Sequence, residues 1–256
     1  LGATAGRTTL NGEGLQHEDG QSQVQASFIP NVRSYDPTFA YEVVTIVQRG
    51  MQRMMAEQQD EYWYLTLMNE NYTHPDMPEG STEGIIKGMY LLKDAGKGKK
   101  GELRVQLMGS GTILREVIAA ADLLDADFGI KADIWSCPSF NELARDGVDA
   151  ERWNRLHPEA KAPRKPWVTQ QLEGRSGPAI AATDYVRHFA NQVREYVPMR
   201  YSVLGTDGYG RSDTRANLRR HFEVDRFHVA HAAVAALAAD GKPTPKALAD
   251  KGIVPF

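Results

Sequence analysis

The sequence predicts an α/β fold built around a mostly parallel sheet with helices on both faces. Short apolar runs typical of strands alternate with segments of helical apolar spacing. The clearest strand-like runs are residues 103–108, 132–137, 179–182 and 201–204, and a helical segment follows each of them. This alternation is typical of βαβ units. The composition agrees with a folded globular chain, because 41% of the 256 residues are hydrophobic and 25% are charged.

The first segment, residues 1–35, is predicted to be an irregular and functional loop. It is rich in Gly, Thr, Gln, Asn and His, and its closely spaced glycines permit positive φ and close backbone approach. Glu13 and His17 lie in this loop among few apolar residues, where a buried histidine is difficult to build. Both residue types suit proton transfer or recognition of an anionic substrate. Residue type alone leaves a solvated polar turn around Glu18 and Asp19 as an equal alternative.

A helix, a strand and a linker follow the loop. Asp36 and Pro37 are predicted to be the N-cap and first residue of a helix over residues 38–56, in which apolar side chains recur at helical spacing. The aromatic run at residues 62–67 predicts a buried strand. Residues 69–80, with three prolines or glycines after a polar stretch, predict a turn-rich linker between two domains.

The remainder of the chain supplies the alternating elements. A short helix is expected at residues 84–92, and residues 94–101 are expected to be an exposed loop rich in Lys and Gly. Gly109-Ser110-Gly111 favours a tight strand-to-helix turn over a phosphate-binding loop, since it is too short for a P-loop. Further helices are expected at residues 113–124, 139–145 with Ser139 as N-cap, 185–193, 214–221 and 225–239.

Charge, cysteine content and hydropathy exclude several classes of protein. The formal net charge is -3 and the isoelectric point about 6.2, which argues against a general nucleic-acid binder. One cysteine excludes an internal disulfide framework and fits a reducing, cytoplasmic compartment. Cys137 itself is expected to be a small buried hydrophobe rather than a nucleophile. No window approaches 18 apolar residues, so no membrane span is expected.

Two other features resemble functional sites. Residues 205–213 combine glycines and aspartates in a way that mimics a metal or diphosphate loop, but the simpler interpretation is structural, with Asp213 and Thr214 capping the next helix. His228 and His231 share one helical face, without an acidic partner at metal-site spacing. Packing or capping is therefore the favoured role for both histidines, and no metal site is predicted.

The N-terminal loop carries a family resemblance. Residues 3–20, with Gly6-Arg7-Thr8-Thr9-Leu10-Asn11-Gly12-Glu13-Gly14-Leu15-Gln16-His17-Glu18-Asp19-Gly20 at their centre, closely resemble the pyruvate dehydrogenase E1 components of the homodimeric bacterial type, within the thiamine-diphosphate-dependent transketolase superfamily. Further matches follow in family order at residues 34–37, 69–72, 139–147, 151–154 and 204–213. Because the family chain is several times longer and this one starts abruptly at Leu1, we expect a C-terminal fragment of a larger polypeptide.

The resemblance implies the domains and the chemistry. Residues 1–78 correspond to the latter part of a pyrimidine-binding domain and residues 79–256 to a transketolase-type C-terminal domain. In the full-length enzyme, thiamine diphosphate and Mg²⁺ are the cofactors, with their main ligands expected upstream of Leu1. Glu13 and His17 would line the cavity over the cofactor. The partners would be pyruvate, the lipoyl domain of the E2 component and a second copy of the chain.

Three alternatives remain open at this stage. The chain could belong to another superfamily enzyme, such as a 2-oxoglutarate dehydrogenase E1 or a transketolase, or it could be a non-catalytic dimerisation module. We expect the chain alone not to bind the cofactors tightly or to be active. The role of residues 69–72 is also open, because their side chains could merely brace the turn between the domains.

Overall fold

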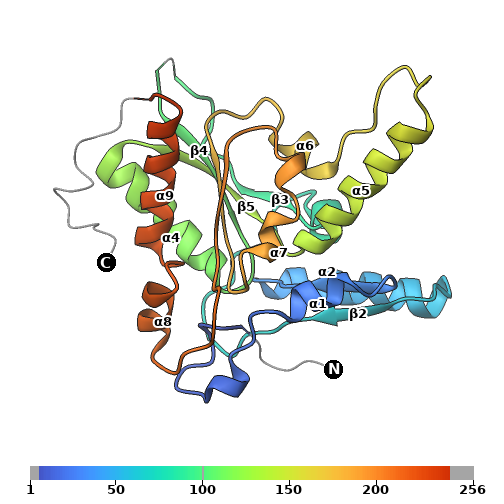
Figure 1. The fold of residues 1–256 in the computed structure, drawn as a ribbon, viewed down its shortest axis with the longest axis horizontal. Coiled ribbons are helices and arrows are strands. Elements are labelled where there is room, and N and C mark those ends of the chain that lie inside the picture. Colours follow the sequence, from blue (N-terminus) through green and yellow to red (C-terminus); the bar gives the residue numbers. More distant parts are fainter. Residues whose placement is uncertain (1–5, 100, 243–256) are drawn as a thin grey trace.

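The computed structural model describes residues 6–99 and 101–242 and contains two sheets (Figure 1). The larger sheet has five strands in the order β3-β5-β4-β6-β7. Within the described residues the edge strand β3 pairs antiparallel with β5. The strands β5, β4, β6 and β7 run parallel to one another. This confirms the predicted α/β fold with a mostly parallel sheet. The strands are β3 (Tyr90–Lys93), β4 (Arg104–Gly109), β5 (Lys131–Ser136), β6 (Ala179–Ala182) and β7 (Tyr201–Leu204).

Successive residues of each strand point to opposite sides of the large sheet, and apolar side chains lie on both sides. Helices therefore cover both faces. On one face, α4 (Ile113–Phe128) and α9 (Arg226–Ala239) pack against a core that includes Leu107 and Ile180. On the other, Met108 and Ala181 belong to a second core. That face is covered by α5 (Phe140–Leu156), α6 (Trp167–Leu172) and α7 (His188–Asn191), as Figure 1 shows.

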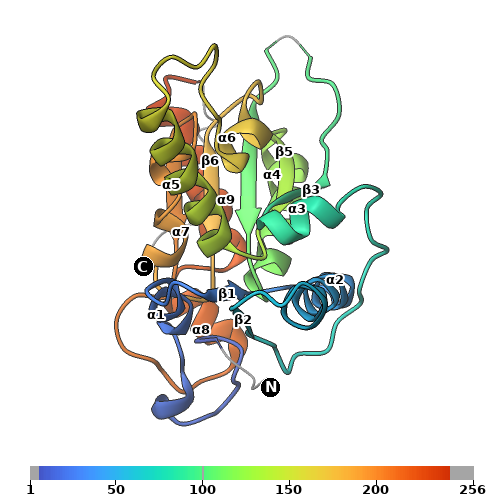
Figure 2. The same cartoon turned by 90° about the vertical axis from the view of Figure 1, so that its right-hand side faces the viewer.

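The smaller sheet lies beneath the large one in both views (Figures 1 and 2). It pairs β1 (Val32–Tyr35) and β2 (Tyr62–Leu65) in parallel, and α1 (Ser22–Ser27) precedes it. The crossover is α2 (Ala40–Met51), which continues as a turn of π-helix (Gln52–Ala56). The predicted helix and strand are both present, but β2 is not the buried strand that was predicted, because Tyr62 is exposed and its other residues are half-buried. The prediction of irregular structure up to residue 35 was wrong for α1 and β1, which are only six and four residues long.

The helix expected at residues 84–92 is a second correction. Helix α3 (Thr82–Lys87) ends at Gly88, which adopts φ 96°, and the chain then reverses into the edge strand β3. A Cβ at Gly88 would lie 2.3 Å from the carbonyl oxygen of Ser139. Tertiary contact therefore overrides the helical apolar spacing at this point.

Asp36 does not cap α2 as predicted. The N-cap is Phe39, and the carboxylate of Glu42 accepts from the backbone N–H groups of Thr38 and Phe39. Asp36 is instead buried, where it accepts hydrogen bonds from the hydroxyls of Thr66, at 2.8 Å, and Ser110, at 2.9 Å. Its carboxylate thus joins the small sheet to the turn after β4.

The remaining helices follow the predicted pattern with different ends. Helices α4 and α5 extend beyond the predicted residues 124 and 145, and the segment 185–193 contains only α7 before a 3-10 turn at Arg194–Tyr196. Helix α8 is Arg215–His221. Ser139 and Thr214 are N-caps as predicted, and Cys137 is fully buried. None of the helices in the described part of the chain is long and apolar enough to cross a membrane.

Candidate functional site

Residues 6–20, called here the N-terminal loop, extend beyond the small sheet at the lower edge of the molecule (Figure 2). A 3-10 turn, Leu15–His17, forms its outer part. Nδ1 of His17 lies 3.0 Å from Oε2 of Glu13, and the two side chains are 56% and 49% exposed. The structure thus brings together the two residues singled out in the sequence, as a solvent-accessible pair that can exchange a proton with a bound molecule.

The base of the loop is buried and bonded to Asp184, which follows β6. Oδ1 of Asp184 accepts from the backbone N–H of Thr8 at 3.0 Å and from its hydroxyl at 2.6 Å. Oδ2 accepts from the hydroxyl of Thr9 at 2.8 Å. Burial raises the pKa of Asp184, and the hydrogen bonds from Thr8 and Thr9 act in the opposite direction. The exposed pair therefore rests on an ordered, desolvated base.

Arg7 fastens the same loop to the segment after β7. Its guanidinium is buried and donates to the carbonyl oxygens of Thr206, at 2.7 Å, and Gly208. Gly20 packs so closely on this guanidinium that a Cβ there would lie 2.4 Å from it. Thr206 and Gly208, within the segment predicted to be structural, accordingly support the loop.

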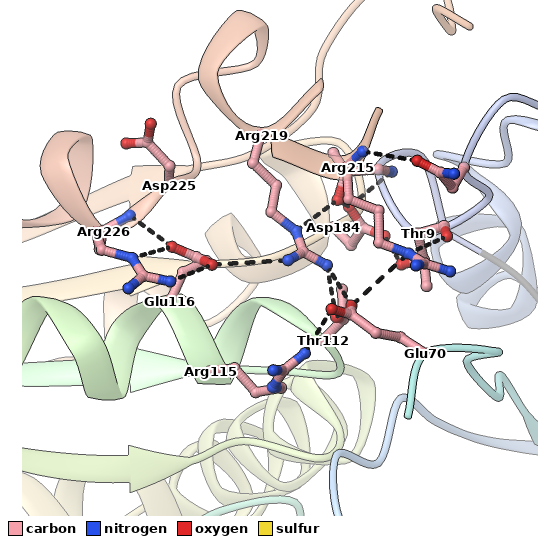
Figure 3. A network of polar contacts seen from close by, with 12 residues as sticks. Thr9, Glu70, Thr112, Arg115, Glu116, Asp184, Arg215, Arg219, Asp225 and Arg226 are labelled. Carbon is pink, nitrogen blue, oxygen red and sulfur yellow. Dashed lines mark hydrogen bonds and ion pairs between the residues drawn. The ribbon is translucent and has the colours of Figure 1, made fainter. Parts of the chain in front are cut away.

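Glu70 is the centre of a third support (Figure 3). Its carboxylate binds Arg219 at 2.6 Å and Arg115 at 2.6 Å, and the hydroxyl of Thr112 donates to it at 3.1 Å. Burial alone would raise the pKa of Glu70, but the two guanidinium groups lower it to about 2. Arg215, on α8, donates to the carbonyl oxygen of Thr9 at 2.8 Å. Glu70 thus braces α4 and α8 against each other, which is a structural role for one of residues 69–72.

Glu18 differs from these residues because its buried carboxylate has no hydrogen-bond partner in the described part of the chain. The side chain is only 4% exposed and packs on Gly210. Burial raises the pKa of Glu18 to about 7, with a smaller contribution from the charge of Asp184. It is not the solvated turn residue that one interpretation of the sequence would require.

The described residues contain no cluster of three or more His, Cys, Asp or Glu side chains that could hold a metal ion. Nδ1 of His228 donates to Oδ1 of Asp225, the residue that caps α9, at 2.7 Å. The cap of α9 is therefore Asp225, and His228 contacts this capping side chain. The side chains present do not provide the oxygen shell that Mg²⁺ needs.

Sequence reasoning missed Arg7, Glu70, Asp184 and Arg219 as contributors to the site. Asp184 carries one usable signal, since it follows a predicted strand and functional side chains gather at the carboxyl ends of parallel strands. The others carry none, because their hydrogen-bond partners, apart from Glu18 for Arg7, lie between 42 and 211 residues away in the sequence.

Two family models match the chain, and they cover most of it. Residues 1–75 match the pyruvate dehydrogenase E1 component middle domain, and residues 88–225 match the transketolase-like C-terminal domain. Pyruvate dehydrogenase E1 components from Cupriavidus necator and Pseudomonas aeruginosa are 61% and 59% identical to it, over 94% and 98% of this chain. The Escherichia coli K12 protein is 55% identical over 98% of the chain. The chain spans only 27–28% of the length of these relatives.

Solved structures support the fold assignment. Transketolase from Campylobacter jejuni superposes with a TM-score of 0.63 at 16% identity, covering 91% of this chain and 31% of that one. A transketolase from Pichia stipitis gives 0.64 at 19% identity, covering 94% and 30%. At these identities the likeness concerns the fold. Together with the family models and the relatives, it shows that the chain belongs to the transketolase-like family and corresponds to a part of the pyruvate dehydrogenase E1 component.

Proposed function

We propose that the chain forms part of an E1 enzyme that oxidatively decarboxylates pyruvate and transfers the acetyl group to a lipoyl group of an E2 component. Identities of 53–61% to E1 components support this assignment over transketolase, whose solved structures are 16–19% identical. We also propose a homodimeric, cytoplasmic enzyme whose domains divide near residue 78. No specific observation favours a purely structural module.

The observation that carries the proposal is the accessible His17–Glu13 pair on an otherwise anchored loop. Thiamine diphosphate, when bound, would supply the electron sink for decarboxylation. His17 would donate to the carboxylate or carbonyl oxygen of the substrate, or move a proton during acetyl transfer. Glu13, whose Oε2 lies 3.0 Å from Nδ1, would accept a hydrogen bond from that nitrogen and so orient the ring.

Replacing His17 by Ala in the complete E1 polypeptide tests this role. We expect turnover to fall by about 100-fold or more, as is typical of a lost general acid or base. Affinity for thiamine diphosphate should change little, because His17 acts on the substrate. Steady-state rates and a cofactor titration would measure the two effects.

His157→Ala provides the matched control. His157 lies just beyond α5, stacked on Trp153 and remote from the N-terminal loop. This variant should retain the turnover of the wild-type enzyme. Wild-type turnover in His17→Ala would refute the proposed role, and so would an equal loss of turnover in both variants.

A further inference from the structure

Both ends of the N-terminal loop are held by one short segment that follows β6. Asp184 receives the three hydrogen bonds from Thr8 and Thr9 at one end of the loop. Two residues later, the backbone N–H of Val186 donates to the carbonyl oxygen of Gly20, at the other end, at 2.9 Å. The segment 184–186 therefore fixes the separation of the two ends between which Glu13 and His17 lie.

The contact at Asp184 has little freedom to relax. Gly6 adopts φ 102°, and a Cβ at this residue would lie 2.2 Å from Oδ2 of Asp184. Asp184 itself is 2% exposed, and its carbonyl oxygen accepts from the hydroxyl of Thr206 at 2.8 Å. The backbone of Asp184 is thus held by Thr206, while its carboxylate is in close contact with the backbone of the loop.

We propose that Asp184 is a positioning residue for the His17–Glu13 pair, so that the segment after β6 sets the geometry of the reaction without touching substrate. This inference rests on the proposed function of His17. The functional pair lies in the exposed outer part of the loop. Its 3.0 Å contact joins two side chains of the same loop. The position of the pair relative to the rest of the molecule therefore depends on the anchors at the base of the loop. Asp184 accepts three of these hydrogen bonds, which are charge-assisted or short.

The test compares Asp184→Ala with Asp133→Ala in the complete E1 polypeptide. Asp133 lies in β5, is 1% exposed, and accepts from Gln106 at 3.0 Å and from the backbone of Ala95 at 2.9 Å. It matches Asp184 in burial and bonding but contacts no residue of the loop. Both variants should lose stability, and only Asp184→Ala should lose activity in the folded fraction.

We expect Asp184→Ala to lower kcat by about 100-fold, since a displacement of about 1 Å can have that effect. Asp184→Asn keeps an acceptor for Thr8 and should retain kcat within about threefold of wild type. Adding Asp184→Ala to His17→Ala should cause no further loss of kcat, because one acts through the other. Hydrogen exchange of the amides of residues 8–18 should accelerate in Asp184→Ala and not in Asp133→Ala.

Several results would overturn the inference. These are wild-type kcat in Asp184→Ala, unchanged hydrogen exchange in the loop, or an equal loss of kcat in Asp133→Ala. If Asp184→Ala does not fold, Thr9→Val, which removes the 2.8 Å bond, takes its place, and an unaltered kcat there counts against the inference. Failure of the proposed function gives a different pattern, in which His17→Ala keeps its turnover while the exchange measurement still reports whether Asp184 holds the loop.

Discussion

Asp36 shows how a single side chain can join two parts of this molecule. Its carboxylate accepts from Thr66, just beyond β2, and from Ser110, just beyond β4. Its backbone N–H donates to the carbonyl oxygen of Pro138 at 2.7 Å, and its own carbonyl oxygen accepts from Gly111 at 3.0 Å. Burial raises the pKa of Asp36 from 3.8 to about 7. The junction of the two sheets therefore contains a group that titrates near neutrality.

A definite pH dependence of stability follows from this residue. Between about pH 4 and about pH 7 the folded state binds the proton and the unfolded state releases it. The contribution of Asp36 to the free energy of unfolding therefore falls as pH rises through this window and is constant above it. Asp36→Asn lacks the titration, so it should gain stability relative to wild type as pH rises, by up to a few kcal/mol.

Urea denaturation of both proteins at about pH 5 and about pH 8 would measure the change. Asp149→Asn, at an exposed position of α5, is the control and should show no comparable gain. A stability difference between Asp36→Asn and wild type that is the same at both pH values would contradict the assignment of the titration to Asp36.

At the scale of residues, the sequence predicted roles that depend on neighbours in the chain. Ser139 caps α5 through the N–H of Glu142, three residues later, and Cys137 follows the last residue of β5 and is buried. Asp36 was misassigned because Asp-Pro is a local helix-start signal, whereas its actual partners lie 30 and 74 residues away. Glu13 and His17 could be singled out because both lie within one local motif, and their role in the reaction stays a prediction.

At the scale of elements, the end of α3 depends on one glycine. Gly88 adopts φ 96° and faces the carbonyl oxygen of Ser139, which precedes α5. Because the chain turns here into β3, the position also sets the edge of the large sheet. Nothing in the apolar spacing of residues 84–92 distinguishes this arrangement from a longer helix.

Gly88→Ala should therefore be destabilising for two reasons. A Cβ at positive φ costs about 1 kcal/mol, and the contact with a backbone oxygen adds about 1–3 kcal/mol. Gly80→Ala is the matched control, since Gly80 has φ 73° with nothing within 4 Å of its added Cβ. Thermal or urea unfolding should give the larger loss for Gly88→Ala. Equal losses would show that strain from the positive φ, and not the contact with Ser139, dominates.

Elements with strong local patterns could be predicted, and short ones could not. Helices α4 and α9 have long apolar faces, and β4 and β5 are continuous buried runs, so their sequences determine their structure. Strands β1 and β3 have four residues each and form only because a partner strand lies alongside. Their pairing is tertiary information that local periodicity does not contain.

At the scale of the molecule, the described residues hold an anchored loop and no metal-binding cluster. We therefore expect the 256-residue chain on its own to bind thiamine diphosphate and Mg²⁺ weakly, since ligands for the diphosphate would have to come from elsewhere. Isothermal calorimetry of the chain, with circular dichroism to verify that it is folded, should detect no tight complex. The complete E1 polypeptide is the positive control, and sub-micromolar affinity of the chain alone would contradict the prediction.

The anchors of the N-terminal loop also determine when it can form. Its bonds join residues 176 apart for Thr8 and Asp184, 199 apart for Arg7 and Thr206, and 204 apart for Asn11 and Arg215. At a synthesis rate of about 5–20 residues per second, about 10–40 s separate the emergence of the loop from that of its supports. The Glu13–His17 pair is consequently among the last parts of the chain to reach its native surroundings, and a nascent chain that stops before β6 carries both residues without Asp184, Thr206 and Arg215, which hold the loop.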